Sequence, residues 1–113
     1  MSTFSIETDN TQSVSVMKVM GRVDSDSAPD LDHALTKLLA DSKNKIVLNL
    51  QGVDYLSSAG LRAMVKALKD AQSSGGDVRL ASVSEPVEVI LRTVGMMQMF
   101  KMFPTNEEAA AGF

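Results

Sequence analysis

The sequence predicts an α/β protein in which helices pack on a mixed β-sheet of four to five strands, in the order β-β-α-β-α-β-α-β-α. Segments with strand periodicity alternate with segments of helical periodicity after an initial hairpin, a pattern typical of parallel strands joined by helices. Residues 45–50 are almost continuously aliphatic, as expected for a strand that is covered on both faces. The chain of 113 residues suits one domain, which we assign to residues 1–113.

The first two strands are predicted to form a hairpin. Phe4, Ile6 and Thr8 alternate with polar residues, as in a strand with one buried face. Valines continue this pattern after a polar connection over residues 9–13, and the second strand ends in the segment Gly21–Asp24.

Three main helices are predicted from apolar residues at helical spacing. Ser27 and Ser84 are candidate N-caps of the first and third helices, and each is followed two positions later by a proline. The second helix follows residues 51–58, which we predict to be a loop, and ends at the glycines of residues 75–76. The residues expected to face the core are Leu31, Ala34, Leu35, Leu38 and Leu39 in the first helix, Leu61, Met64, Val65, Leu68 and Ala71 in the second, and Val87, Ile90, Leu91 and Val94 in the third.

Two short strands and a last helix complete the pattern. We predict strands over residues 78–81 and 100–103, separated by the third helix, which ends at Gly95. Thr105 and Glu108 form a capping-box pattern that opens a short terminal helix.

Four methionines follow the third helix closely: Met96, Met97, Met99 and Met102. They either fill the core beneath that helix or form an adaptable surface for a partner, because methionine side chains repack easily.

Composition excludes several classes of function. The net charge is −3, and the chain holds four phenylalanines, one tyrosine and no tryptophan, which argues against a nucleic-acid surface. Without cysteine, and with His33 as its one histidine, the chain lacks the ligands of a usual zinc site. No apolar run is long enough for a membrane span, and residues 1–5 do not resemble a secretory signal. We therefore expect a cytoplasmic protein without membrane insertion, cofactor or metal.

The sequence shows no enzyme motif. Leu56 and Ser57 precede Ser58, so this serine does not stand in the Gly-x-Ser-x-Gly elbow of a hydrolase. The glycines at residues 75–76 lack the lysine of a phosphate-binding P-loop. Because no acid–base pair or metal set is evident either, we expect that the protein is not an enzyme.

The loop before the second helix is the main candidate for chemistry, because functional groups of open α/β sheets gather where strands lead into helices. Ser57 or Ser58 is expected to cap this helix, where free amides can bind an anion. The first turn holds no acid, and Arg62 is its first charged residue, which suits a helix end that holds a phosphate. Gly60 costs up to about 1 kcal/mol relative to alanine, which indicates close approach by another group. The alternative is that both serines are ordinary helix-start residues.

A resemblance to a known family is carried by residues 46–50, Ile-Val-Leu-Asn-Leu, and by residues 53–62, Val-Asp-Tyr-Leu-Ser-Ser-Ala-Gly-Leu-Arg. Together they resemble the signature of the STAS-domain anti-sigma-factor antagonists. The resemblance extends over nearly the whole chain and includes the segment at residues 21–24 and the turn at residues 75–76. It implies a single STAS domain with a STAS-like mixed sheet.

Members of that family are phosphorylation-controlled partner switches. The resemblance implies that an anti-sigma factor, itself a serine protein kinase of ATPase fold, binds the protein when Ser58 is unmodified and releases it after phosphorylating Ser58. A serine phosphatase resets the switch. Ser57 is the alternative acceptor, because many members carry aspartate at its position, and Asp24 matches an acidic position beside the phosphorylated residue. The partner-binding residues expected from the resemblance are Asp24, Ser25, Ser57, Ser58, Ala59, Gly60 and Arg62.

Two other functions remain open from the sequence. The domain could be an accessory subunit that serves as a scaffold in a transporter or a stress-sensing complex. It could also be a small-ligand-binding module that holds a nucleotide through the amides of the serine loop.

Overall fold

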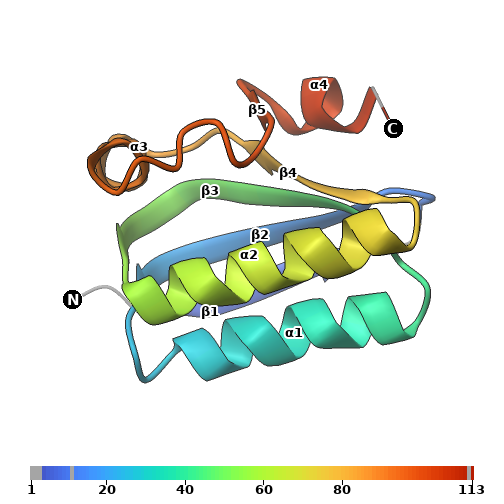
Figure 1. Cartoon of the computed structure of the whole chain (residues 1–113), viewed down its shortest axis with the longest axis horizontal. Helices are drawn as coiled ribbons and strands as arrows, with labels where there is room; N and C mark the ends of the chain where they lie inside the picture. Colours follow the sequence, from blue (N-terminus) through green and yellow to red (C-terminus); the bar gives the residue numbers. More distant parts are fainter. Residues whose placement is uncertain (1–3, 11, 112) are drawn as a thin grey trace.

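One five-stranded sheet forms the centre of the protein, and its strand order follows the sequence order, β1-β2-β3-β4-β5 (Figure 1). The computed structural model describes residues 4–10, 12–111 and 113. β1 pairs with β2 in antiparallel orientation, and the other neighbouring strands are parallel. The predicted mixed sheet and element order are confirmed. The strands are β1 Ser5–Asp9, β2 Ser15–Val23, β3 Lys45–Leu56, β4 Asp77–Ala81 and β5 Met102–Phe103.

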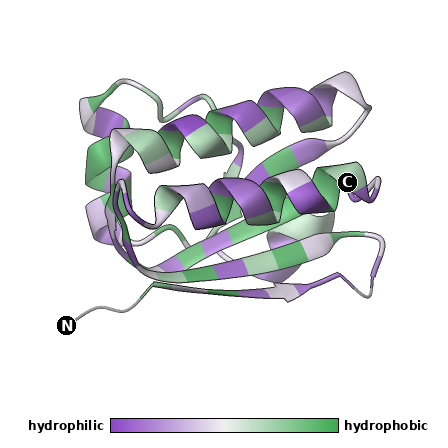
Figure 2. Ribbon diagram, turned by 90° about the horizontal axis from the view of Figure 1, so that it is seen from below, coloured by the Kyte–Doolittle hydropathy of each residue, from purple (hydrophilic) through white to green (hydrophobic). Residues whose placement is uncertain are grey.

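The helices in the described part of the chain are α1 Ala28–Ala40, α2 Ser58–Ser73, α3 Glu85–Thr93 and α4 Asn106–Ala111. Right-handed crossovers between successive parallel strands place α1, α2 and α3 on one face of the sheet. Buried side chains of these three helices accordingly share one core cluster with Met17 and Val19 of β2 and with Ile46 and Leu48 of β3. α1 and α2 lie side by side (Figure 1). Figure 2 shows hydrophilic and hydrophobic residues alternating along the helical ribbons, as in helices with one buried side.

α4 covers part of the opposite face of the sheet. Ala109 packs there with Val47 and Ala81 in a small second cluster. Asn49 is 7% exposed on β3, and its Nδ2 donates a hydrogen bond to Asn106 Oδ1 at 2.8 Å, which fixes the start of α4. β3 is therefore covered on both faces, which explains its nearly continuous run of apolar residues.

β3 runs to Leu56, so the prediction of a loop over residues 51–58 is wrong up to that residue. β2 pairs with β3 as far as Val23 opposite Leu56, with register shifts along the way. In this extension Val53 and Leu56 are buried while the residues between them are exposed, a spacing of three that does not resemble a strand. As a result, the strand leads into α2 through a single connecting residue, Ser57.

Ser27 and Ser84 occupy the N-cap positions of α1 and α3, as predicted, but neither side chain makes a capping hydrogen bond. Ser27 Oγ donates to the carbonyl of Arg22 at 2.8 Å, and Ser84 Oγ donates to the carbonyl of Val53. Both hydroxyls therefore tie the start of a helix to a neighbouring strand instead of stabilising the first helical turn.

The C-terminal end of α3 and the start of α4 have the capping residues that the sequence predicts. Gly95 has φ +74° directly after the C-cap residue Val94, as predicted. Val94, however, is 52% exposed and does not face the core, because α3 ends at Thr93. Thr105 Oγ1 accepts a hydrogen bond from the Glu108 amide at 3.1 Å, as its capping-box position predicts.

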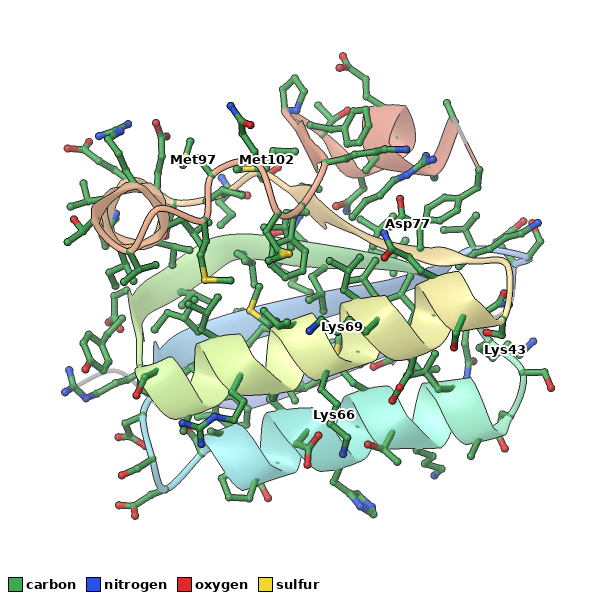
Figure 3. All side chains as sticks on the ribbon, in the orientation of Figure 1. Lys43, Lys66, Lys69, Asp77, Met97 and Met102 are labelled. Carbon is green, nitrogen blue, oxygen red and sulfur yellow. The ribbon has the colours of Figure 1, made fainter. Side chains whose placement is uncertain are left out.

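The methionines after α3 divide between core and surface. Met96, Met97 and Met102 pack against the main core, and Figure 3 shows Met97 and Met102 between α3 and α4. Met99 is 42% exposed. The core-filling interpretation is confirmed for Met96, Met97 and Met102.

Some expectations fall partly outside the described residues. The connection over residues 9–13 contains Thr11, the domain assigned to residues 1–113 contains residues 1–3 and Gly112, and residues 1–3 also belong to the segment expected not to resemble a secretory signal.

Ser15, at the start of β2, offers a test of the core. It is fully buried, and its hydroxyl has no hydrogen-bond partner among the described residues. Such a group costs about 1–3 kcal/mol, so Ser15→Ala is expected to raise the free energy of unfolding by about 1 kcal/mol. Urea denaturation measures this change, and Ser13→Ala at an exposed position is the matched control, expected within about 0.5 kcal/mol of the unmodified protein. A less stable Ser15→Ala variant would show that the hydroxyl has a partner in solution.

Candidate functional site

Ser57 links β3 to α2 and caps the helix. Its Oγ accepts a hydrogen bond from the Gly60 amide at 3.1 Å, and its carbonyl accepts one from the Leu61 amide at 2.9 Å. Its backbone is extended, with ψ 167°, as is typical of an N-cap residue. Of the two candidate caps, Ser57 is therefore the one whose hydroxyl satisfies an amide of the first turn.

Ser58 is the first residue of α2, and its side chain is exposed. The first turn contains no acidic residue. Arg62 follows one turn later, is exposed, and forms no ion pair with another described residue. Since Cβ atoms four residues apart on a helix are separated by about 5–6 Å, a negative charge on Ser58 would lie near both the positive helix end and the Arg62 guanidinium.

Gly60 is buried where the start of α2 meets the ends of two strands. A Cβ atom on Gly60 would lie 2.5 Å from Val23 Cγ1 and 2.9 Å from Leu56 Cδ1. The close approach expected from the sequence is therefore present, but the approaching groups belong to the protein's own core. Gly60 is buried and allows α2 to pack against β2, and its contact with a partner stays a prediction.

Asp24 organises the connection between β2 and α1. Its Oδ1 accepts hydrogen bonds from the amides of Asp26 and Ser27, each at 3.0 Å, and from the Ser27 hydroxyl at 3.1 Å. The hydrogen bond from the Ser27 backbone is the main cause that lowers the pKa of Asp24 below its ordinary value. Arg22 Nε, 3.6 Å from Asp24 Oδ2, contributes in the same direction. Asp24 is thus a fixed negative charge on this loop.

A backbone hydrogen bond joins the two loops. The Ser57 amide donates to the carbonyl of Val23 at 2.8 Å. Asp24 and Ser58 each follow directly after one member of this bonded pair. The carboxylate and the exposed serine therefore share one edge of the sheet, where β2 and β3 end.

Arg22 and Tyr55 form a surface pair that the sequence reasoning missed. The two residues are cross-strand partners in β2 and β3, and the Arg22 guanidinium carbon lies 4.1 Å from the centroid of the Tyr55 ring. Tyr55 is 37% exposed. The pair could have been found only with the register of β2 and β3 beyond residue 50, where the sequence suggested a loop.

A groove between the first halves of α1 and α2 opens next to Ser58, with a volume of about 270 Å³. Its rim carries Arg62 and Lys66 from α2, Asp32 from α1, and Ser25 from the preceding loop. Lys66 Nζ lies 3.6 Å from Asp32 Oδ1, and Figure 3 shows Lys66 between the two helices. We call this feature the α1–α2 groove. Its apolar lining consists of Ala28, Pro29, Ala59 and Ala63.

The predicted site residues thus come from two loops and one helix start. Ser25, Ala59 and Arg62 line the α1–α2 groove, and His33 is exposed on α1. Within residues 4–10, 12–111 and 113, no group of three or more histidine, cysteine, aspartate or glutamate side chains could hold a metal ion. In the same ranges, no helix combines the length and the apolar character that crossing a membrane requires.

The protein is a small α/β domain in which an exposed serine, Ser58, lies at the junction between β3 and α2. Comparison with protein-family models makes the assignment specific: the chain belongs to the STAS domain family, whose model matches residues 5–109. The resemblance inferred from the two sequence segments is confirmed.

Two relatives have assigned roles. BtrV of Bordetella bronchiseptica, provisionally named an anti-sigma factor antagonist, is 30% identical over 95 residues, which are 84% of this chain and 82% of BtrV. The anti-sigma-B factor antagonist of Staphylococcus aureus is 28% identical over 94 residues, which are 83% of this chain and 87% of the relative.

Solved structures share the fold. An anti-sigma factor antagonist from Mycobacterium paratuberculosis has a TM-score of 0.83 at 24% identity, with 95% of this chain and 91% of that chain covered. A sulfate transporter family protein from Wolinella succinogenes has a TM-score of 0.73 at 18% identity, with 88% and 83% covered. At these identities the likeness concerns the fold alone.

The packing of Gly60 can be tested by substitution. Gly60→Ala is expected to lower the free energy of unfolding by about 1–2 kcal/mol, because overpacking against Val23 outweighs the better helix propensity of alanine. Thermal or urea denaturation measures the loss. In a Val23→Ala background, which provides room for the new methyl group, the same substitution should cost less. Additive losses in the double variant would contradict the contact.

The charge of Asp24 predicts a pH dependence. Since the folded-state pKa is lowered, the stability that the carboxylate contributes is fully present above its unperturbed pKa of 3.8 and is lost as the pH falls through the folded pKa. Asp24→Asn is therefore expected to be less stable than the unmodified protein at neutral pH, with the difference shrinking below about pH 4. Urea denaturation between pH 3 and pH 7 would measure it, with the exposed Asp54→Asn as control. A difference that is constant with pH would rule out a role for the charge.

Proposed function

We propose that this protein is an anti-sigma factor antagonist that acts as a phosphorylation-controlled partner switch, with Ser58 as the phosphorylated residue. The observation that carries the proposal is the exposed hydroxyl of Ser58 at the start of α2, beside a serine whose hydroxyl already caps the helix. Membership of the STAS domain family and the roles assigned to two relatives support the same general function.

The geometry favours Ser58 over Ser57 as acceptor. A kinase needs a hydroxyl that can reach the γ-phosphate of ATP, and Ser58 is exposed. Ser57 is half-buried and its Oγ is engaged with the Gly60 amide. Phosphorylation of Ser57 would require its hydroxyl to leave the Gly60 amide before it could reach the kinase.

The proposed switch works by charge. In the unmodified state, the edge formed by Asp24 and Ser58 binds an anti-sigma factor that is also a serine kinase of ATPase fold. A phosphate on Ser58 adds a charge of about −1.5 to −2, which repels Asp24 and acidic groups of the partner and must be desolvated in the interface. The fold stays unchanged because a helix N-terminus favours an anion. A serine phosphatase in the same cytoplasm restores binding.

Substitutions at Ser58 test this function. Ser58→Ala is expected to bind the kinase as tightly as the unmodified protein, whereas Ser58→Glu is expected to bind at least about tenfold more weakly, a loss of about 1.4 kcal/mol. Isothermal titration calorimetry with the purified kinase measures both. Equal affinities of the two variants would favour the accessory-subunit role, in which the serine is not a switch.

The acceptor is located by mass spectrometry after incubation with the kinase and ATP. Ser57→Ala should still be phosphorylated, although its lost cap lowers stability by about 1 kcal/mol, and Ser58→Ala should not. Phosphate on Ser57 would overturn the assignment.

A further inference from the structure

Positive charge is concentrated along α2 in a protein whose net charge is −3. Arg62, Lys66 and Lys69 are exposed at spacings of four and three residues, so they lie along one side of the helix. The first acidic residue of α2 is Asp70, near its far end. This row of cations begins one helical turn after Ser58, and its first two members, Arg62 and Lys66, border the α1–α2 groove.

The three cations differ in their surroundings. Lys66 is paired with Asp32 across the groove at 3.6 Å (Figure 3). Lys69 follows further along α2 and is not among the residues that line the groove. Arg62 lies between Ser58 and Lys66 and forms no ion pair within the described ranges. The groove therefore presents a guanidinium group, able to bind a carboxylate through two hydrogen bonds, above a lining of small apolar side chains.

We infer that the α1–α2 groove is the docking site for a segment of the partner kinase that carries a carboxylate next to small apolar residues. Arg62 pairs with that carboxylate, and the phosphate of Ser58 takes Arg62 away from it. The inference rests on the proposed function for the identity of the partner and for the phosphate. It adds a specific surface and a specific residue through which the phosphate acts.

Charge complementarity selects this occupant. An acidic segment supplies the anion that Arg62 lacks, and the groove, at about 270 Å³, has room for a few small side chains. A basic segment would meet Arg62 and Lys66 with like charge. A second copy of this acidic chain is the competing occupant, and the experiments below separate it from the kinase.

The phosphate competes from within the same helix. Ser58 and Arg62 are four residues apart, the spacing at which side chains on a helix meet. A phosphoserine dianion attracts a guanidinium more strongly than a single carboxylate does, and it needs no loss of translational freedom to reach Arg62. Phosphorylation therefore removes the docking cation while the shape of the groove stays the same.

Capture of the phosphate by Arg62 can be measured without a partner. Protein with phosphoserine incorporated at position 58 is titrated by ³¹P NMR, alone and as the Arg62→Gln and Lys69→Gln variants. We expect the second pKa of the phosphate to be about 0.3 unit higher in Arg62→Gln than in the parent, because an ion pair at this spacing favours the dianion. Lys69→Gln removes the same charge further from Ser58 and should titrate like the parent. Identical titrations of Arg62→Gln and the parent would overturn the capture.

Docking is measured by calorimetry with the unphosphorylated protein and the purified kinase. Arg62→Glu is expected to weaken binding at least about tenfold, and the matched Lys69→Glu by less than about threefold. If Ser58→Glu weakens binding and Arg62→Glu does not, the inference fails and the proposed function stands. If Ser58→Glu leaves binding intact, the proposed function fails and the release of the kinase through Arg62 falls with it, whereas docking through Arg62 is decided by Arg62→Glu alone.

Sedimentation of the unmodified protein tests the competing occupant. We expect no self-association that depends on Arg62. A dimer that is present in the parent and in Lys69→Glu but lost in Arg62→Glu would assign the groove to a second copy of the chain and overturn the inference.

Discussion

The start of α2 is held against the end of β2 by two contacts that act together. The Ser57 amide donates to the carbonyl of Val23, and the absence of a side chain on Gly60 lets the helix rest on the Val23 side chain. These contacts fix where α2 begins and therefore where Ser58 points. They also set the distance between the two loops that form the candidate site. A displacement of α2 would alter the serine, the acidic loop and the α1–α2 groove at once.

Most serines at this edge of the sheet serve the fold. The hydroxyls of Ser27 and Ser84 bind carbonyls of neighbouring strands, and the hydroxyl of Ser57 caps α2. Ser58, by contrast, is exposed at the first helical position. In this site, hydrogen bonds hold the other serine hydroxyls in place, and the Ser58 hydroxyl faces solvent. Such an arrangement suits a switch that changes charge, because phosphorylation of Ser58 needs little change in conformation.

Electrostatics divides the surface around Ser58 into two parts. On one side, backbone amides hold Asp24 as a fixed anion. On the other side, Arg62 begins a row of cations along α2. A phosphate placed between them is repelled by the first and attracted by the second. In the proposed switch, one phosphate would therefore act on both parts of this surface.

The sequence by itself determined the α/β class, the order of elements and most of the core-facing residues of the helices. These features follow from the spacing of apolar and polar residues within single segments of the chain. Tertiary structure alone decided that β3 continues to Leu56, that Ser57 is the cap and Ser58 the exposed serine, and that Gly60 is buried against Val23. Each of these depends on how β2 pairs with β3 through shifts of register, and such pairing joins residues more than thirty positions apart that no local pattern relates.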